Sequence, residues 1–74
     1  MNGNHPVFKE YDSVELTEDL DVTLRSGTRG AIVMVYPGSP PEFEVEFVND
    51  KGDTLSIRTV KEFQICKVKH DGEQ

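Results

Sequence analysis

The stretch Glu42–Val48 has the strictest hydrophobic alternation in the chain, with apolar residues separated by glutamates. Side chains on a β-strand point alternately to the two faces of a sheet, so this pattern predicts a half-buried strand. The residues expected to point into a core are Phe43, Val45 and Phe47, and those expected to point outward are Glu42, Glu44 and Glu46. A period of two does not fit a helix, and this part of the chain is therefore committed to β-structure.

Four other short runs extend the β pattern along the chain. They predict strands over residues 13–16, 31–36, 53–60 and 64–69, with one short 3₁₀ turn in the corner at 61–63. The predicted inward set is Val14, Leu16, Phe43, Val45, Phe47, Leu55, Ile57 and a subset of Ile32, Val33 and Val35. Five closely spaced strands without a convincing helix predict a small all-β barrel over residues 11–69. Polar tails, expected to be flexible, would occupy residues 1–10 and 70–74.

Glycine and proline divide these strands. Gly27 and Gly30 predict a left-handed backbone or a close approach of two chains just before the second strand. Three prolines within Pro37–Pro41 exclude that segment from the sheet. Asp50–Gly52 fits a three-residue hairpin loop with a left-handed Gly52. This loop would place Phe47 opposite Leu55, Val45 opposite Ile57 and Glu44 opposite Arg58, leaving Glu42 and Glu46 unpaired.

The run Ala31–Tyr36 is apolar on both alternating faces. A bulge in this strand would change its inward parity midway. If Val33 and Val35 point inward, Met34 and Tyr36 are exposed together beside the proline loop. The alternative is that Met34 and Tyr36 pack under the N-terminal segment.

The amino-acid composition restricts the possible functions more than it restricts the possible folds. The chain has 74 residues, 8 basic and 14 acidic side chains, and a formal net charge of −6, which argues against binding a phosphate backbone. Its single cysteine, Cys66, is expected to be a buried, inert thiol, and no intrachain disulfide can form. No signal peptide or membrane span is expected, and the predicted location is the cytoplasm.

No residue pattern predicts catalysis, a cofactor or a metal. Both histidines, His5 and His70, fall in the predicted tails, so they cannot be expected to converge with a nucleophile. Residues 10–21 contain six carboxylates, but their spacing is not that of a calcium loop. We therefore expect a protein that is not an enzyme.

Three blocks of the sequence resemble a known family. They are Tyr11–Asp19, Gly27–Tyr36 and Glu44–Gly52, in this order. The chain is similar to a family of small, stand-alone bacterial proteins known only as a domain of unknown function. The resemblance implies an SH3-like barrel of five strands with a short 3₁₀ turn before the last strand, and it implies no established activity. Met34 departs from the family pattern, where an acidic residue is usual.

Two classes of function remain open. The first is an acidic protein-interaction module, for example the inhibitory or antitoxin-like partner of a basic protein. Its candidate contact residues are Met34, Tyr36, Pro37, Pro40, Glu42, Glu44 and Glu46. The alternative is a nucleic-acid or ribosome-associated barrel, against which the net charge argues. The chain is expected to be a monomer or a weak homodimer without membrane contact.

Overall fold

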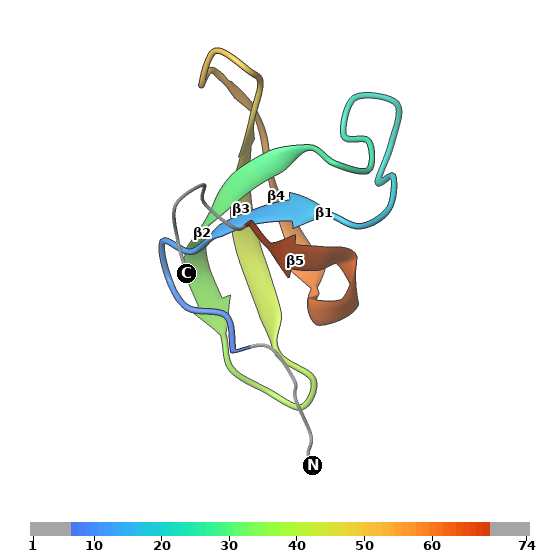
Figure 1. The fold of residues 1–74 in the computed structure, drawn as a ribbon. Helices are drawn as coiled ribbons and strands as arrows, with labels where there is room; N and C mark the ends of the chain where they lie inside the picture. Colours follow the sequence, from blue (N-terminus) through green and yellow to red (C-terminus); the bar gives the residue numbers. More distant parts are fainter. Residues whose placement is uncertain (1–6, 69–74) are drawn as a thin grey trace.

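The structure is a computed structural model, and it describes residues 7–68 (Figure 1). The strands are β1 (Ser13–Leu16), β2 (Arg29–Tyr36), β3 (Glu42–Val48), β4 (Thr54–Lys61) and β5 (Ile65–Lys67), and the 3₁₀ turn η1 (Glu62–Gln64) precedes β5. They form one antiparallel sheet in the order β4-β3-β2-β1-β5. The expectation of an all-β, five-stranded fold with a 3₁₀ turn before the last strand is confirmed.

The sheet curls on itself but does not close. β2 and β3 run together along one side of the molecule, whereas β1 and β5 cross them at an angle (Figure 1). β4 and β5 are the two ends of the strand order and do not pair with each other. The term barrel therefore describes the curvature of this sheet and not a closed ring of strands.

The inner face of the curled sheet holds the core. Its buried side chains are Phe8, Val14, Leu16, Leu24, Ile32, Phe43, Val45, Phe47, Val60 and Ile65. The expected inward positions on β1 and β3 are all confirmed, as is Ile32 on β2. The predicted inward set did not include Phe8, Leu24, Val60 and Ile65. Cys66 is exposed where a buried thiol was expected.

Phe8 belongs to the segment that we expected to be a tail. Its ring packs edge-on against Phe43, with 5.3 Å between ring centroids. A turn holds it there: the Asp12 N–H donates to the Lys9 carbonyl at 3.1 Å, and the Tyr11 N–H donates to the Ile32 carbonyl at 2.6 Å. Phe8 therefore adds a large apolar side chain to a small core. Residues 1–6 and 69–74, with His5 and His70, lie outside the described residues.

β2 contains the expected change of parity. Its pairing with β3 shifts between Ile32 and Met34, which marks a bulge. Ile32 is fully buried before the bulge, and Val35 packs against the core after it. Because of this shift, Met34 and Tyr36 both point out of the core, as one of the two alternatives predicted.

The β3–β4 hairpin follows the predicted register only at its turn. The Asn49 N–H donates to the Asp53 carbonyl at 2.9 Å, and Gly52 has the expected left-handed backbone with φ +89°. A second irregularity between Phe47 and Val48 then shifts the register by one residue. Phe47 lies opposite Ser56, Val45 opposite Arg58, and Glu44 opposite Thr59. The predicted pairs Phe47–Leu55, Val45–Ile57 and Glu44–Arg58 are therefore wrong.

This shift reverses the two faces of β4. Leu55 and Ile57, predicted to be inward, are exposed, whereas Val60 is buried opposite Phe43. Arg58 does not meet Glu44; its Nη1 donates instead to Asp21 Oδ2 at 2.7 Å. Because β4 contains one extra residue at this point, two apolar side chains that were predicted to lie in the core lie at the surface.

Gly27, just before β2, and Gly30, its second residue, have the roles that the sequence predicted. Gly27 has φ +92°, a left-handed conformation that other residues rarely adopt. A Cβ at Gly30 would lie 2.5 Å from the Glu46 carbonyl oxygen, so only glycine allows β2 and β3 to approach this closely. Gly27 therefore allows the turn at the end of the loop, and Gly30 allows β2 to pair closely with β3.

Candidate protein-binding face

The outward side of β2, β3 and β4 forms a continuous surface, which we call the outer face. Residues that lie opposite each other in antiparallel strands point to the same side of the sheet, so pairing defines its cross-strand rows. These rows are Ala31–Glu46–Ile57, Met34–Glu44–Thr59 and Tyr36–Glu42–Lys61. A glutamate of the central strand thus occupies the middle of each row.

The three glutamates of β3 have different partners. Lys61 Nζ lies 3.1 Å from Glu42 Oε2, the Tyr36 hydroxyl donates to Glu44, and the Thr54 hydroxyl donates to Glu46. The expectation that Glu42 would be unpaired is wrong. Among residues 7–68, no Lys or Arg nitrogen lies within 4.0 Å of Glu44 or Glu46. Their negative charge is therefore only moderated by a hydroxyl and not neutralised.

The bond between Tyr36 and Glu44 links two of these rows diagonally. Because the phenol hydroxyl donates to a carboxylate, the pKa of Tyr36 is raised above its usual value of 10.0. The phenol therefore keeps its proton at neutral pH and remains a donor. This bond directs the Tyr36 hydroxyl toward Glu44, which lies opposite Met34 in the neighbouring row.

Apolar side chains surround the glutamates. Met34 is 45% exposed, Ile57 52% and Tyr36 39%, which is unusual for three large apolar side chains on one side of a small sheet. Leu55 is 39% exposed, but it is the residue skipped in the β3–β4 pairing and belongs to none of the three rows. Met34 and Tyr36 were predicted for this surface. Ile57 was not, because the alternation in residues 53–60 indicates its burial when the bulge is not known.

The proline loop continues the outer face at one end. Pro37 and Pro40 are exposed in the connection between β2 and β3, directly after Tyr36 and before Glu42. All seven predicted contact residues thus lie on the outer face or in the loop that borders it. The structure places one further apolar residue, Ile57, on this face.

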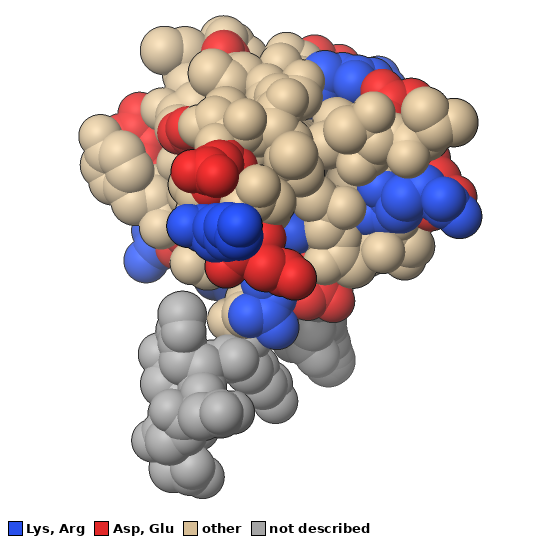
Figure 2. Space-filling model, turned by 90° about the horizontal axis from the view of Figure 1, so that it is seen from above, with Lys and Arg blue, Asp and Glu red and all other residues tan. Residues whose placement is uncertain are grey.

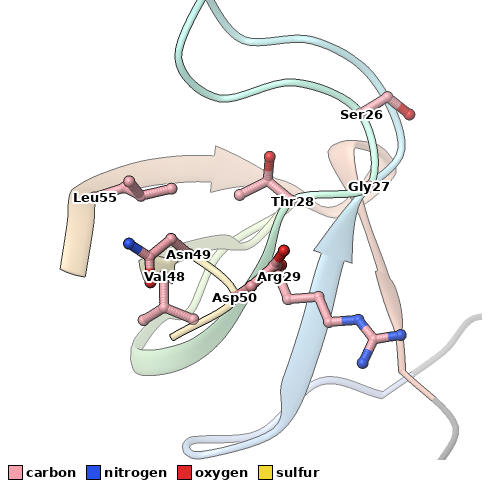
Figure 3. A pocket seen from close by; sticks show the side chains of 8 residues that line it. All are labelled: Ser26, Gly27, Thr28, Arg29, Val48, Asn49, Asp50 and Leu55. Carbon is pink, nitrogen blue, oxygen red and sulfur yellow. The ribbon is translucent and has the colours of Figure 1, made fainter. Parts of the chain in front are cut away.

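An open depression of about 600 Å³ lies at the opposite end of the outer face, between the segment Ser26–Arg29 and the β3–β4 hairpin (Figure 3). The Leu55 and Val48 side chains line it together with Thr28, whereas the Arg29 guanidinium points away (Figure 3). The Asn49 side-chain oxygen already accepts the N–H groups of Lys51 and Asp53, both at 2.9 Å. The depression therefore suits an apolar side chain of a binding partner better than a charged ligand.

Most basic side chains in the described part of the chain already form ion pairs. These pairs are Arg25–Asp19, Arg29–Glu15, Arg58–Asp21, Lys61–Glu42 and Lys67–Asp12. On the face shown in Figure 2, blue side chains lie beside red ones and form no extended basic patch. Paired cations attract a phosphate backbone less strongly than free ones.

The carboxylates before β2 serve the fold. Asp19 accepts the Ser26 N–H at 2.7 Å, and Asp21 accepts the N–H groups of Thr23 and Leu24 at 2.8 and 2.9 Å. The Arg58 guanidinium, followed by the N–H groups of Thr23 and Leu24, holds the pKa of Asp21 below its usual value. The Ser26 N–H is the largest cause of the lowered pKa of Asp19. Within residues 7–68, no group of three or more His, Cys, Asp or Glu side chains is arranged to hold a metal ion.

The fold and this surface define a small all-β domain with an acidic, partly apolar sheet face. The chain belongs to the family described as Domain of unknown function (DUF4926), whose model matches residues 10–67. The resemblance found in the sequence is thereby confirmed. Comparison with curated proteins and with solved structures gave no match. Within residues 7–68, no helix has the length and hydrophobicity needed to cross a membrane.

Proposed function

We propose that this protein is a non-enzymatic binding module whose outer face contacts a basic protein partner, which it inhibits or stabilises. The observation that carries this proposal is the combination on one face of exposed Met34, Tyr36 and Ile57 with two glutamates that have no cationic partner among the described residues. Exposed methionine and aromatic side chains are enriched in protein interfaces.

The charges favour a basic partner. Glu44 and Glu46 occupy the middle of two rows, where lysine or arginine side chains of a partner would meet carboxylates held by hydroxyl groups. Such complementarity contributes mainly to specificity and to the rate of association, whereas the apolar contacts contribute most of the affinity. The depression beside Leu55 would receive an apolar side chain at the edge of the same interface.

The same observations weigh against the alternative of nucleic-acid binding. Affinity for a phosphate backbone depends on lysine and arginine, and five of these side chains are paired with carboxylates in the described residues. Phe43 and Phe47 are buried, so they cannot act as platforms for stacking bases.

A capture experiment with matched variants tests the proposal. Wild-type protein, Met34→Lys and Val22→Lys would each be immobilised and exposed to a lysate of the source organism. Val22 is 90% exposed in the loop before β2, so Val22→Lys adds the same charge away from the outer face. We expect a basic protein that is retained by wild type and by Val22→Lys and lost by Met34→Lys. Equal retention by all three, or retention on heparin at low salt, would contradict the proposal.

A further inference from the structure

A second depression, of about 400 Å³, adjoins the one shown in Figure 3. Arg29 and Val48 line both depressions, which therefore lie next to each other on the sheet. The pairing of the strands explains its position, since Ser13, Ala31 and Glu46 lie opposite one another on β1, β2 and β3. The second depression thus lies where the outer face meets β1, and it is lined by two small side chains and one carboxylate.

The walls of the second depression are apolar. Val48 on β3 lines one part of it, and Val68, just after β5, lines another. The Val68 N–H donates to the Ser13 carbonyl at 3.0 Å, which fixes this residue beside β1. Between these two valines, the short side chains of Ser13 and Ala31 leave the surface hollow. The lining therefore offers contact to an aliphatic chain.

The carboxylate of Glu46 gives the second depression a negative charge. Glu46 is half-buried and accepts the Thr54 hydroxyl, and no Lys or Arg nitrogen of residues 7–68 lies within 4.0 Å of it. Arg29 also lines the depression, but its Nε lies 3.6 Å from Glu15 Oε1 and is thus paired elsewhere. A partly buried carboxylate attracts a cation more strongly than one on an open surface, because less water screens it.

Lysine and arginine combine the two properties that this lining requires. Each has a cationic group at the end of an aliphatic stem, and the stem packs on apolar surface while the charge stays near water. The stem would contact Val48 and Val68, and the cation would meet Glu46. On the other side of Val48, the depression beside Leu55 suits an apolar side chain.

We propose that the second depression binds a lysine or arginine side chain of the partner, and that the first depression binds a large apolar side chain next to it. This inference rests on the proposed function and adds the chemistry that the partner must present to this end of the outer face. Glu46 supplies the specificity for a cation, and the small size of Ala31 and Ser13 supplies the space.

Selection from a library of random heptapeptides displayed on phage tests this chemistry. The full chain would be immobilised, and we expect the enriched peptides to carry lysine or arginine beside a large apolar residue. Ala31→Phe, which fills the depression with a side chain that strands accept, should abolish this enrichment. Val22→Phe adds the same side chain at a position that lines neither depression and should not. No enrichment, enriched peptides without a cation, or equal enrichment on Ala31→Phe would overturn the inference.

Calorimetric titration of one enriched peptide locates the cation. Replacing its lysine by norleucine keeps the stem and removes the charge, and should weaken binding to wild type by about fivefold or more. Glu46→Gln should weaken binding of the lysine peptide to a similar extent and make the norleucine replacement nearly neutral, because both changes remove one contact. Glu18→Gln removes a carboxylate that lines neither depression and should preserve the effect of norleucine. Independent effects of norleucine and Glu46→Gln would show that the cation binds elsewhere.

Capture of the cellular partner separates this inference from the proposed function. A partner that is lost by Met34→Lys but retained by both Ala31→Phe and Glu46→Gln would leave the proposed function standing and overturn the role of the second depression. If wild type retains no basic protein while the peptides bind as described, the proposed function fails and the chemistry of the depression stands.

Discussion

The acidic side chains of the loop before β2 and those of β3 are used in different ways. In the loop, Asp19 and Asp21 accept backbone N–H groups and pair with Arg25 and Arg58. On the outer face, Glu44 and Glu46 accept only hydroxyl groups from Tyr36 and Thr54. The loop carboxylates therefore stabilise the conformation of the loop, whereas the carboxylates of the sheet remain charged and accessible to a partner.

The acidic residues behind the net charge of −6 therefore have two different roles. Aspartate, with its short side chain, reaches backbone N–H groups within its own loop. Glutamate on the outward side of a strand reaches only its cross-strand neighbours. Substitutions in the loop should therefore change stability, and substitutions on the outer face should change binding.

The largest expected effect comes from Leu24, the side chain that anchors the loop. It is 1% exposed, so Leu24→Ala should remove core volume and lower the free energy of unfolding by about 2–5 kcal/mol. Urea denaturation followed by circular dichroism would measure it. Val22→Ala, at a 90% exposed position in the same loop, is the control and should change stability little. Equal effects would mean that the loop is not anchored by burial.

A smaller effect, dependent on pH, is expected at Asp21. Its pKa is lowered from the usual 3.8, first by Arg58 and then by the N–H groups of Thr23 and Leu24. A lowered pKa in the folded state means that the ionised group stabilises the fold above pH 3.8, and that this contribution disappears as the pH falls through the lowered pKa. Acid should therefore weaken the attachment of the loop to β4.

Two substitutions at Asp21 separate charge from hydrogen bonding. Asp21→Asn keeps an oxygen for the N–H groups of Thr23 and Leu24 but loses the charge that faces Arg58, whereas Asp21→Ala loses both. At neutral pH we expect stability to fall in the order wild type, Asn, Ala. The difference between wild type and Asn should shrink as the pH falls through the lowered pKa. A difference that is independent of pH would contradict the role given to Arg58.

The smallest effect on stability is expected at Glu44. Glu44→Gln keeps an oxygen for the Tyr36 hydroxyl, and at this partly exposed position it should change the free energy of unfolding by no more than about 0.5 kcal/mol. Binding to a basic partner identified by capture should nevertheless weaken, mainly through slower association. Surface plasmon resonance at two salt concentrations would show this. An unchanged association rate would place the contact elsewhere.

Local patterns were sufficient to predict much of this fold. The alternation in Glu42–Val48 correctly placed every side chain of β3, and the glycines correctly marked the left-handed turn at Gly52 and the close approach at Gly30. These features depend on neighbouring residues or on the absence of a Cβ. The same is true of the bulge in β2, which explains how Met34 and Tyr36 can both be exposed.

The predictions of burial are wrong where contacts between distant parts of the chain determine which side chains are buried. In β4 the local alternation favours burial of Leu55 and Ile57, but burial of Val60 against Phe43 and the contact of Arg58 with Asp21 require the opposite parity. Neither partner is close in sequence. The sequence gives only a weak indication that Phe8 and Leu24 are buried, because each is a single large apolar residue in a polar segment. The position of these segments depends on the completed sheet.

The bulge at Leu55 also determines where this chain can change in length. Leu55 is the residue skipped in the β3–β4 ladder, since Val48 lies opposite Thr54 and Phe47 opposite Ser56. A chain that lacked Leu55 could keep every other pair of the hairpin. Removing one residue from 57–59 would also remove the bulge, but it would shift the residues between Leu55 and the gap by one place and turn their side chains to the opposite face of the sheet. Among related sequences, gaps within this strand should therefore occur at position 55 or 56 more often than at 57–59.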